Sequence, residues 1–185
     1  MARLTSSPTL DEKSAQALFS ADQLAGELNR LGLHFLRSYP SAEQPLIPPA
    51  VLLAGLAASS EARLRLALIP LFLWRPDYGH VVRNSATRLL PRDRLTLQCY
   101  YTAAVLGQRM YAKRLQTLHI PMVPLHNQYA RLLGVPVDGT PAQQLSALAR
   151  RQAQLTNEPL NWLGTYHHAI QTFLRQLDNE QAWTS

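Results

Sequence analysis

Apolar residues recur at helical spacing along most of this chain. Between residues 92 and 118, one stripe advances in steps of four and three positions and comprises Leu97, Tyr101, Ala104, Gln108, Tyr111, Leu115 and Leu118. Such a stripe predicts one long helix that packs on a neighbouring helix, with Leu97, Tyr101, Leu115 and Leu118 buried. Because Gln108 lies on the same stripe, we expect its amide to have a hydrogen-bond partner.

Helix start and stop signals divide the rest of the chain. Residues 9–12 and 20–23 form two capping boxes, which predict helices through about Phe19 and about Ser38. Thr140, Pro141 and Gln143 mark another helix start, and this helix should run to about Leu155. Further helices are expected over 48–58, over 60–74 with a kink at Pro70, over 77–90 with Asp77 as N-cap, over 125–133 before Gly134, and over 159–177.

No stretch alternates between apolar and polar residues with a period of two, as a half-buried strand would. The fold class we expect is therefore all-α, with more than about 60% helix. The short turns between residues 48 and 118 favour a compact bundle of antiparallel helices. Residues 60–68 also resemble the second helices of HEAT-type α-hairpin repeats, so the middle of the bundle has a HEAT-like alternative.

The prolines at 40, 45, 48 and 49 and the prolines at 121 and 124 suggest segment boundaries. We expect an N-terminal helical segment over 1–39, a basic helical core over 45–119 and a C-terminal segment over 125–185. The C-terminal segment should pack on the core, so that the whole forms one domain, as the length of 185 residues allows.

Composition narrows the class of protein. Hydrophobic residues make up 46% and charged residues only 16%, which argues against a disordered tail. The single cysteine, Cys99, excludes a disulfide framework and should be a buried, inert thiol. The longest apolar run, 66–74, is far shorter than the roughly 20 residues that span a bilayer, and the first residues lack the apolar core of a signal peptide. We expect a cytoplasmic protein that does not bind membranes.

The net charge of +6 is concentrated in the middle third of the chain. Residues 63–131 carry 11 Lys and Arg against two Asp, whereas 1–62 and 132–185 each carry a small acidic excess. With so few carboxylates nearby, these cations repel one another unless a partner neutralises them. The middle third therefore predicts a binding surface for an acidic protein or a nucleic acid.

The candidate binding residues fall in two stretches of this basic segment. Tyr100 is included because it lies off the apolar stripe and could stack on a base, whereas Tyr101 and Tyr111 are expected in the core. The complete predicted set is Arg88, Arg92, Arg94, Tyr100, Arg109, Lys113 and Arg114.

Catalytic motifs are scarce. The chain has no Gly-rich phosphate loop, no HExxH motif and no acidic pair at helical spacing in an apolar context, so we expect no cofactor and no metal. The stretch from Arg114 to His119 does resemble the Arg-x4–6-His pattern of HEPN ribonucleases. That resemblance would imply an RNA-cleaving helical dimer in which Arg114 and His119 are catalytic.

These observations favour a non-catalytic helical interaction protein. We expect an accessory, inhibitor or antitoxin-like subunit whose basic middle docks an acidic protein partner or the nucleic acid of that partner. A direct RNA- or DNA-binding module is the first alternative, and a HEPN-like ribonuclease is the second.

Overall fold

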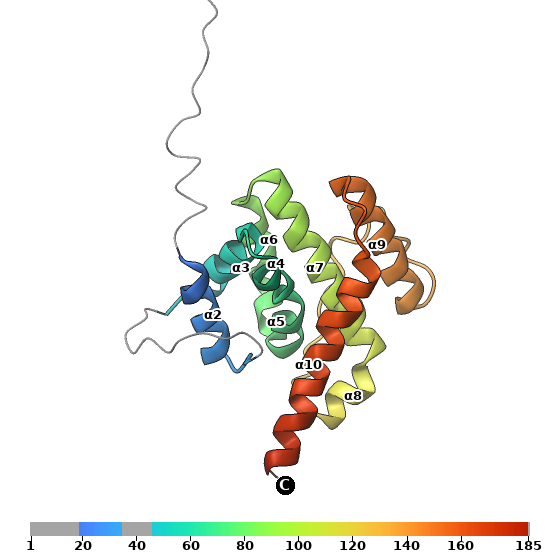
Figure 1. Cartoon of the computed structure of the whole chain (residues 1–185). Coiled ribbons are helices and arrows are strands. Elements are labelled where there is room, and N and C mark those ends of the chain that lie inside the picture. Colours follow the sequence, from blue (N-terminus) through green and yellow to red (C-terminus); the bar gives the residue numbers. More distant parts are fainter. Residues whose placement is uncertain (1–18, 35–45, 185) are drawn as a thin grey trace, which may run out of the picture.

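The computed structural model describes residues 19–34 and 46–184 (Figure 1). Within these ranges the chain is 69% helical and contains no strand, so the expected all-α bundle is confirmed. The predicted helix over 9–19 and the prolines at 40 and 45 lie outside the described residues. The helices are α2 (Ala21–Arg30), α3 (Pro49–Ala58), α4 (Ala62–Leu66), α5 (Leu68–Trp74), a 3-10 helix (Pro76–His80), α6 (Val82–Thr87), α7 (Pro91–Met110), α8 (Ala112–Thr117), α9 (Pro141–Thr156) and α10 (Trp162–Thr184).

Helix α7 runs through the middle of the bundle (Figure 1). Its most extensive contacts are with α5 and α9, and α10 packs against α5, α7 and α9. Every residue of α7 from Leu97 to Gln108 is buried. The buried apolar side chains form one continuous core that extends from Leu24 in α2 to Leu177 in α10.

The predicted apolar stripe is confirmed at the four positions that were expected to be buried. Leu97, Tyr101, Leu115 and Leu118 are all buried. Gln108 has the expected partners, because its Nε2 donates to the carbonyl of Val123 and its Oε1 accepts from the N–H of Leu125, each at 2.9 Å.

The stripe nevertheless belongs to two helices instead of one. The backbone leaves helical geometry at Tyr111 (φ −111°, ψ 20°), which separates α7 from α8. One turn earlier, Gly107 faces Ile170 of α10 so closely that a Cβ there would lie 2.8 Å from the Ile170 side chain. The hydroxyl of Tyr111 accepts a hydrogen bond from Gln171 of the same helix, so the break lies where α10 crosses α7. Periodicity along one segment carries no information about such a crossing.

Both capping boxes within the described residues are confirmed. Ser20 caps α2 and Thr140 caps α9, and in each case the glutamine three residues later bonds back to the capping residue. Helix α2 ends at Arg30 and not near Ser38, because Gly32 adopts a positive φ of 93° and its neighbours close the helix end.

The structure differs from two helix predictions between residues 60 and 90, one at Pro70 and one at Asp77. The kink expected at Pro70 is instead a division into α4 and α5 at Ala67, since the proline ring clashes with the carbonyl four residues earlier and leaves it without its N–H donor. Asp77 does not cap a helix. Its carboxylate accepts hydrogen bonds from Arg75 at 3.0 and 2.8 Å, and a 3-10 helix precedes α6.

The helix predicted over 125–133 is also wrong, because this segment forms turns. Leu125, Tyr129, Ala130 and Leu133 are buried, whereas Leu132 is 68% exposed, and residues 125–128 lie beside α7 before the chain turns. Gln108 and the hydroxyl of Tyr101, which donates to the carbonyl of His126 at 3.0 Å, hold it there. These side-chain bonds take the place of helical backbone bonds.

Candidate binding site

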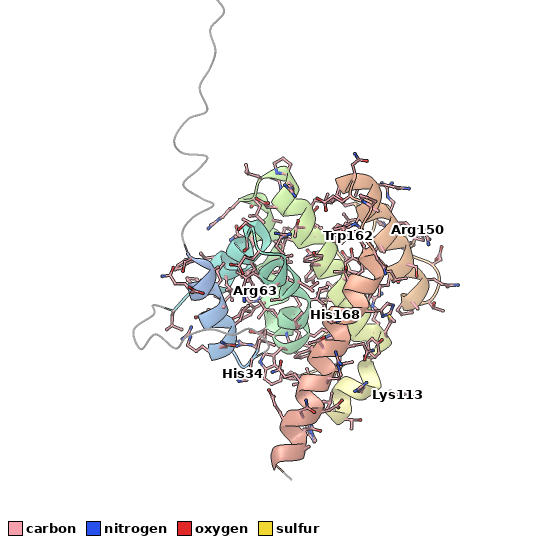
Figure 2. All side chains as sticks on the ribbon, in the orientation of Figure 1. His34, Arg63, Lys113, Arg150, Trp162 and His168 are labelled. Carbon is pink, nitrogen blue, oxygen red and sulfur yellow. The ribbon has the colours of Figure 1, made fainter. Side chains whose placement is uncertain are left out.

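The structure divides the predicted binding residues into two groups at opposite ends of α7. Arg88, Arg92 and Arg94 lie at the turn from α6 to α7, and Arg109, Lys113 and Arg114 lie around the start of α8. From Arg92 to Arg109 the helix rises by about 26 Å at about 1.5 Å per residue. Figure 2 shows Lys113 at the lower end of the bundle and Trp162, which lies nearer to the first group, at the upper end. The two groups cannot contact one small partner site together.

The three arginines at the α6–α7 turn differ in what holds them. Arg94 is partly buried, and its guanidinium donates to the carbonyls of Ala86 and Leu89 at 3.0 Å, so it closes the end of α6. Arg92 is 83% exposed and has one long ion pair, 3.4 Å, with Glu158. The Arg88 side chain is exposed, with no hydrogen bond or ion pair to the described residues. Arg88 and Arg92 are thus available to a partner, and Arg94 has a structural role.

The group around the start of α8 likewise contains two exposed cations without a partner among the described residues and one that is held. Arg109 and Lys113 are exposed, and their side chains have no partner within 19–34 and 46–184. Arg114 forms an ion pair of 2.5 Å with Asp178 of α10. This pair links α8 to α10 on the surface of the bundle.

Tyr100 corrects the sequence-based expectation, because it is buried and cannot stack on a free base. Only 4% of it is exposed, and its ring meets that of Tyr166 edge to face at 6.2 Å. Burial raises the pKa of Tyr100 to about 12. Helix α10 covers α7 at Tyr100, off the apolar stripe, and a single amphipathic pattern does not reveal this second contact.

Arg114 lies in α8, His119 follows the end of that helix, and both residues are exposed. His119 lies just after the helix with a positive φ of 57°, and its backbone N–H bonds to the carbonyl of Gln116. His119 therefore terminates α8 in left-handed conformation, and Arg114 is held by Asp178. Both positions have a structural explanation that does not require catalysis.

A hollow beside the first basic group was not predicted from the sequence. It has a volume of about 950 Å³ and lies between α2, α3, the α6–α7 turn, the first half of α7 and the α9–α10 turn. We call it the α7 hollow. One wall is apolar and built of small residues of α3, including Ala50, Ala54 and Ala58. In the sequence, only the spacing of these alanines, four residues apart, indicated this wall.

The other wall of the α7 hollow is polar and comes from α7, α9 and α10. It includes Thr96 and Tyr100, Gln152 and Thr156, and Trp162. The Nε1 of Trp162 is buried and has no hydrogen-bond partner, although only 8% of this residue is exposed. A buried donor left unpaired costs about 1–3 kcal/mol, so this wall is suited to a ligand that offers an acceptor.

Charges of both signs surround the opening. Arg65, Arg88 and Arg92 line the hollow together with Asp93 and Glu158. Arg65 donates to the backbone carbonyls of Ser59 and Ser60 at 2.7 and 2.8 Å and has no carboxylate partner among the described residues. Arg88 has no ion pair among the described residues either, so three arginines and two carboxylates line the hollow and leave an excess of one positive charge.

No three His, Cys, Asp or Glu side chains among the described residues gather in a way that could hold a metal ion. None of the described helices is long and apolar enough to cross a bilayer.

No protein-family model matches the chain, and no curated protein and no solved structure is significantly similar to it.

Proposed function

We propose that this protein is a non-catalytic helical interaction subunit, of accessory, inhibitor or antitoxin-like type, that docks an acidic protein partner at the α6–α7 turn. The observation that carries this proposal is the exposure of Arg88 and Arg92 beside a hollow. Neither guanidinium is held tightly by the described residues, so neither needs to break a strong internal pair before it meets a partner carboxylate.

Exposed apolar side chains next to these arginines support a protein partner. Leu90 is 42% exposed and lies between the two arginines in sequence, and Leu160 is 56% exposed two residues after the ion-pair partner of Arg92. Arginine beside apolar surface is typical of the centre of protein interfaces. Phosphate groups would neutralise the arginines but would leave both leucines in water.

Direct nucleic-acid binding loses one of its supports. Tyr100 and Tyr101 lie in the core, so the aromatic stacking that accompanies single-strand binding is not provided by them. The basic residues at the two ends of α7 remain as candidate phosphate contacts, and the experiment below includes this outcome.

Selection from a random peptide display library tests the proposal, because it needs no identified partner. We expect the selected peptides to combine Asp or Glu with a large apolar residue. Because two charge contacts are reversed, the double variant Arg88→Glu/Arg92→Glu should bind these peptides at least about tenfold more weakly. The matched control Arg109→Glu/Lys113→Glu, at the other end of α7, should bind within about twofold of wild type.

Fluorescence anisotropy with a 20-mer RNA and a 20-bp DNA separates the alternative. Nucleic-acid binding whose log affinity falls with log salt at a slope of about −0.9 for each duplex phosphate contacted, together with no peptide enrichment, would favour the nucleic-acid module. Equal peptide binding by the Arg88→Glu/Arg92→Glu variant and by wild type would contradict docking at the α6–α7 turn.

The ribonuclease alternative has its own assay. RNA cleavage by the wild type that is abolished in both Arg114→Ala and His119→Ala would support it and would overturn a non-catalytic function. We expect no cleavage by any of the three proteins.

A further inference from the structure

The α7 hollow has the size and the two-sided lining of a small-molecule site. Its volume of about 950 Å³ falls within the range of about 300–1,000 Å³ that is common for ligand pockets. The α3 wall presents methyl groups of Ala50, Ala54 and Ala58, whose short side chains leave room for an apolar body. The opposite wall is polar, so a ligand that fits both walls must be amphipathic.

Three hydrogen-bond donors on the polar wall come from three different helices and lack partners within the described residues. The Nε1 of Trp162 in α10 is buried and unpaired. In α9, the Oε1 of Gln152 accepts a hydrogen bond from the hydroxyl of Tyr166, and its Nε2 has no partner within the described residues. The hydroxyl of Tyr100 in α7 likewise makes no hydrogen bond within them. All three residues line the hollow, so a ligand oxygen there would find several donors.

The charges at the hollow favour an anionic oxygen. Arg92 is paired with Glu158, whereas Arg65 is bound only to backbone carbonyls and the Arg88 side chain has no partner within 19–34 and 46–184. Asp93 also lines the hollow, so the lining carries an excess of one positive charge. A carboxylate would accept from the neutral donors and would also be attracted by these two guanidinium groups. An ammonium group could pair with Asp93 or Glu158, but the unpaired donors of Trp162 and Gln152 would offer it no acceptor.

We propose that the α7 hollow binds a small monocarboxylic acid with an apolar body. The carboxylate is held by the donors of the polar wall and by Arg65 and Arg88, and the apolar body lies against the small residues of α3. Arg88 also belongs to the proposed docking surface at the α6–α7 turn, but this inference does not rest on a protein partner, because its other contacts lie within the hollow.

Isothermal titration calorimetry with defined acids tests the proposal. The probes are decanoate, which has an aliphatic body, and 2-naphthoate, which has an aromatic one. The methyl ester of each acid serves as the neutral control. We expect at least one acid to bind with a dissociation constant below about 1 mM, and its ester to bind at least about tenfold more weakly, since the ester lacks the charge.

Substitutions of residues that line the hollow then locate the site. Tyr100→Phe and Trp162→Phe each remove one donor and keep an aromatic ring, so each should weaken binding of the acid by about fivefold to tenfold. Ala54→Leu places a larger side chain in the hollow and should abolish binding. Tyr111→Phe is the matched control, because it removes a hydroxyl outside the hollow, and it should bind as wild type does. Circular dichroism establishes that each variant is folded.

Several results would overturn the proposal. These are the absence of binding by both acids at about 5 mM, equal binding of acid and ester, and unchanged binding in Tyr100→Phe, Trp162→Phe and Ala54→Leu. If Ala54→Leu fails to fold, acid binding by Tyr100→Phe and Trp162→Phe decides whether the hollow is the binding site. These variants leave Arg88, Leu90 and Arg92 in place, so peptide binding at the α6–α7 turn stands or falls independently of this result.

Discussion

At the scale of single residues, Gln108 fixes the segment after α8 to the central helix. Its two hydrogen bonds hold the carbonyl of Val123 and the N–H of Leu125, and the second bond is buried. Gln108→Leu keeps much of the volume but leaves that N–H unpaired. We expect urea unfolding to show a loss of about 1–3 kcal/mol.

The control for this variant is Gln116→Leu, at an exposed position of α8 whose side chain makes no hydrogen bond to the described residues. It should change the free energy of unfolding by less than about 0.5 kcal/mol. Equal losses in the two variants would show that the segment after α8 does not depend on Gln108.

The buried thiol and phenols predict how stability depends on alkaline pH. Burial raises the pKa of Cys99 from 9.0 to about 12 and that of Tyr100 from 10.0 to about 12. Between these values the unfolded chain loses protons that the folded chain keeps, so the free energy of unfolding falls as pH rises from about 9 towards 12. Each group contributes a slope of up to about 1.4 kcal/mol per pH unit.

Urea unfolding at several pH values measures this slope, and Cys99→Ala should reduce it above pH 9. A reagent for free thiols provides a second check. It should react slowly with the folded protein at pH 8 and rapidly once guanidinium unfolds the chain. Rapid reaction in the folded state would contradict the burial of Cys99.

Residue environments were predictable from the sequence only where one helix pattern determined them. The stripe placed Tyr101 and Gln108 in the core because both lie on its apolar side. The same pattern left Tyr100 outside, because it assumes one buried face. In the structure α7 is covered on both sides, and Tyr100 meets Tyr166 of α10. That contact spans 66 positions and leaves no local trace.

At the scale of elements, the short helix α8 depends on the core for its stability. It has only six residues, too few to persist in isolation. Its fully buried anchor is Leu115, which is 1% exposed. Leu115→Ala should therefore cost about 2–4 kcal/mol, from lost burial and the cavity left behind.

Thermal unfolding of Leu115→Ala beside Lys113→Ala measures this cost. Lys113 is exposed on the same helix, and alanine is a good helix former, so its replacement should change stability very little. Unchanged stability of Leu115→Ala would mean that α8 does not pack as the structure shows.

Helix boundaries were predictable where a local device creates them. The capping boxes of Ser20 and Thr140 lie as expected, because each acts within one turn. The boundaries that failed depend on side-chain bonds to distant backbone or on other helices. Residues 125–133 follow α7 because Gln108 accepts from the N–H of Leu125 and Tyr101 donates to the carbonyl of His126, although the apolar pattern of this segment alone favours a helix.

At the scale of the whole molecule, the sequence shows the excess of positive charge, but it does not show that the basic residues form two groups at opposite ends of α7. Linear order places Arg92 and Arg109 in one basic segment, and the straight helix between them separates them by about 26 Å. The α7 hollow was equally hidden, since its walls come from segments between Phe19 and Trp162. Only the packing of α2, α3, α7, α9 and α10 brings those walls together.

The unbalanced charge predicts that salt stabilises the folded protein. Residues 63–131 carry 11 cationic side chains against two carboxylates, and the ion pairs at Arg92 and Arg114 are exposed and worth little. Folding brings these cations closer together, and about 0.2 M salt shortens the screening length to less than about 10 Å. The melting temperature should therefore rise by a few degrees between about 10 mM and 0.2 M KCl.

Two variants show whether repulsion within the basic segment causes this rise. Arg109→Gln/Lys113→Gln removes two cations that have no partner among the described residues, so the melting temperature should increase at low salt and depend less on KCl. Arg63→Gln removes a cation that Glu61 already neutralises at 2.6 Å, so it should leave the salt dependence unchanged or steeper. A melting temperature that falls as KCl is added to the wild type would mean that attraction in the ion pairs outweighs repulsion. The exposed arginines would then be balanced within the fold, and the case for an acidic partner at the α6–α7 turn would lose its electrostatic basis.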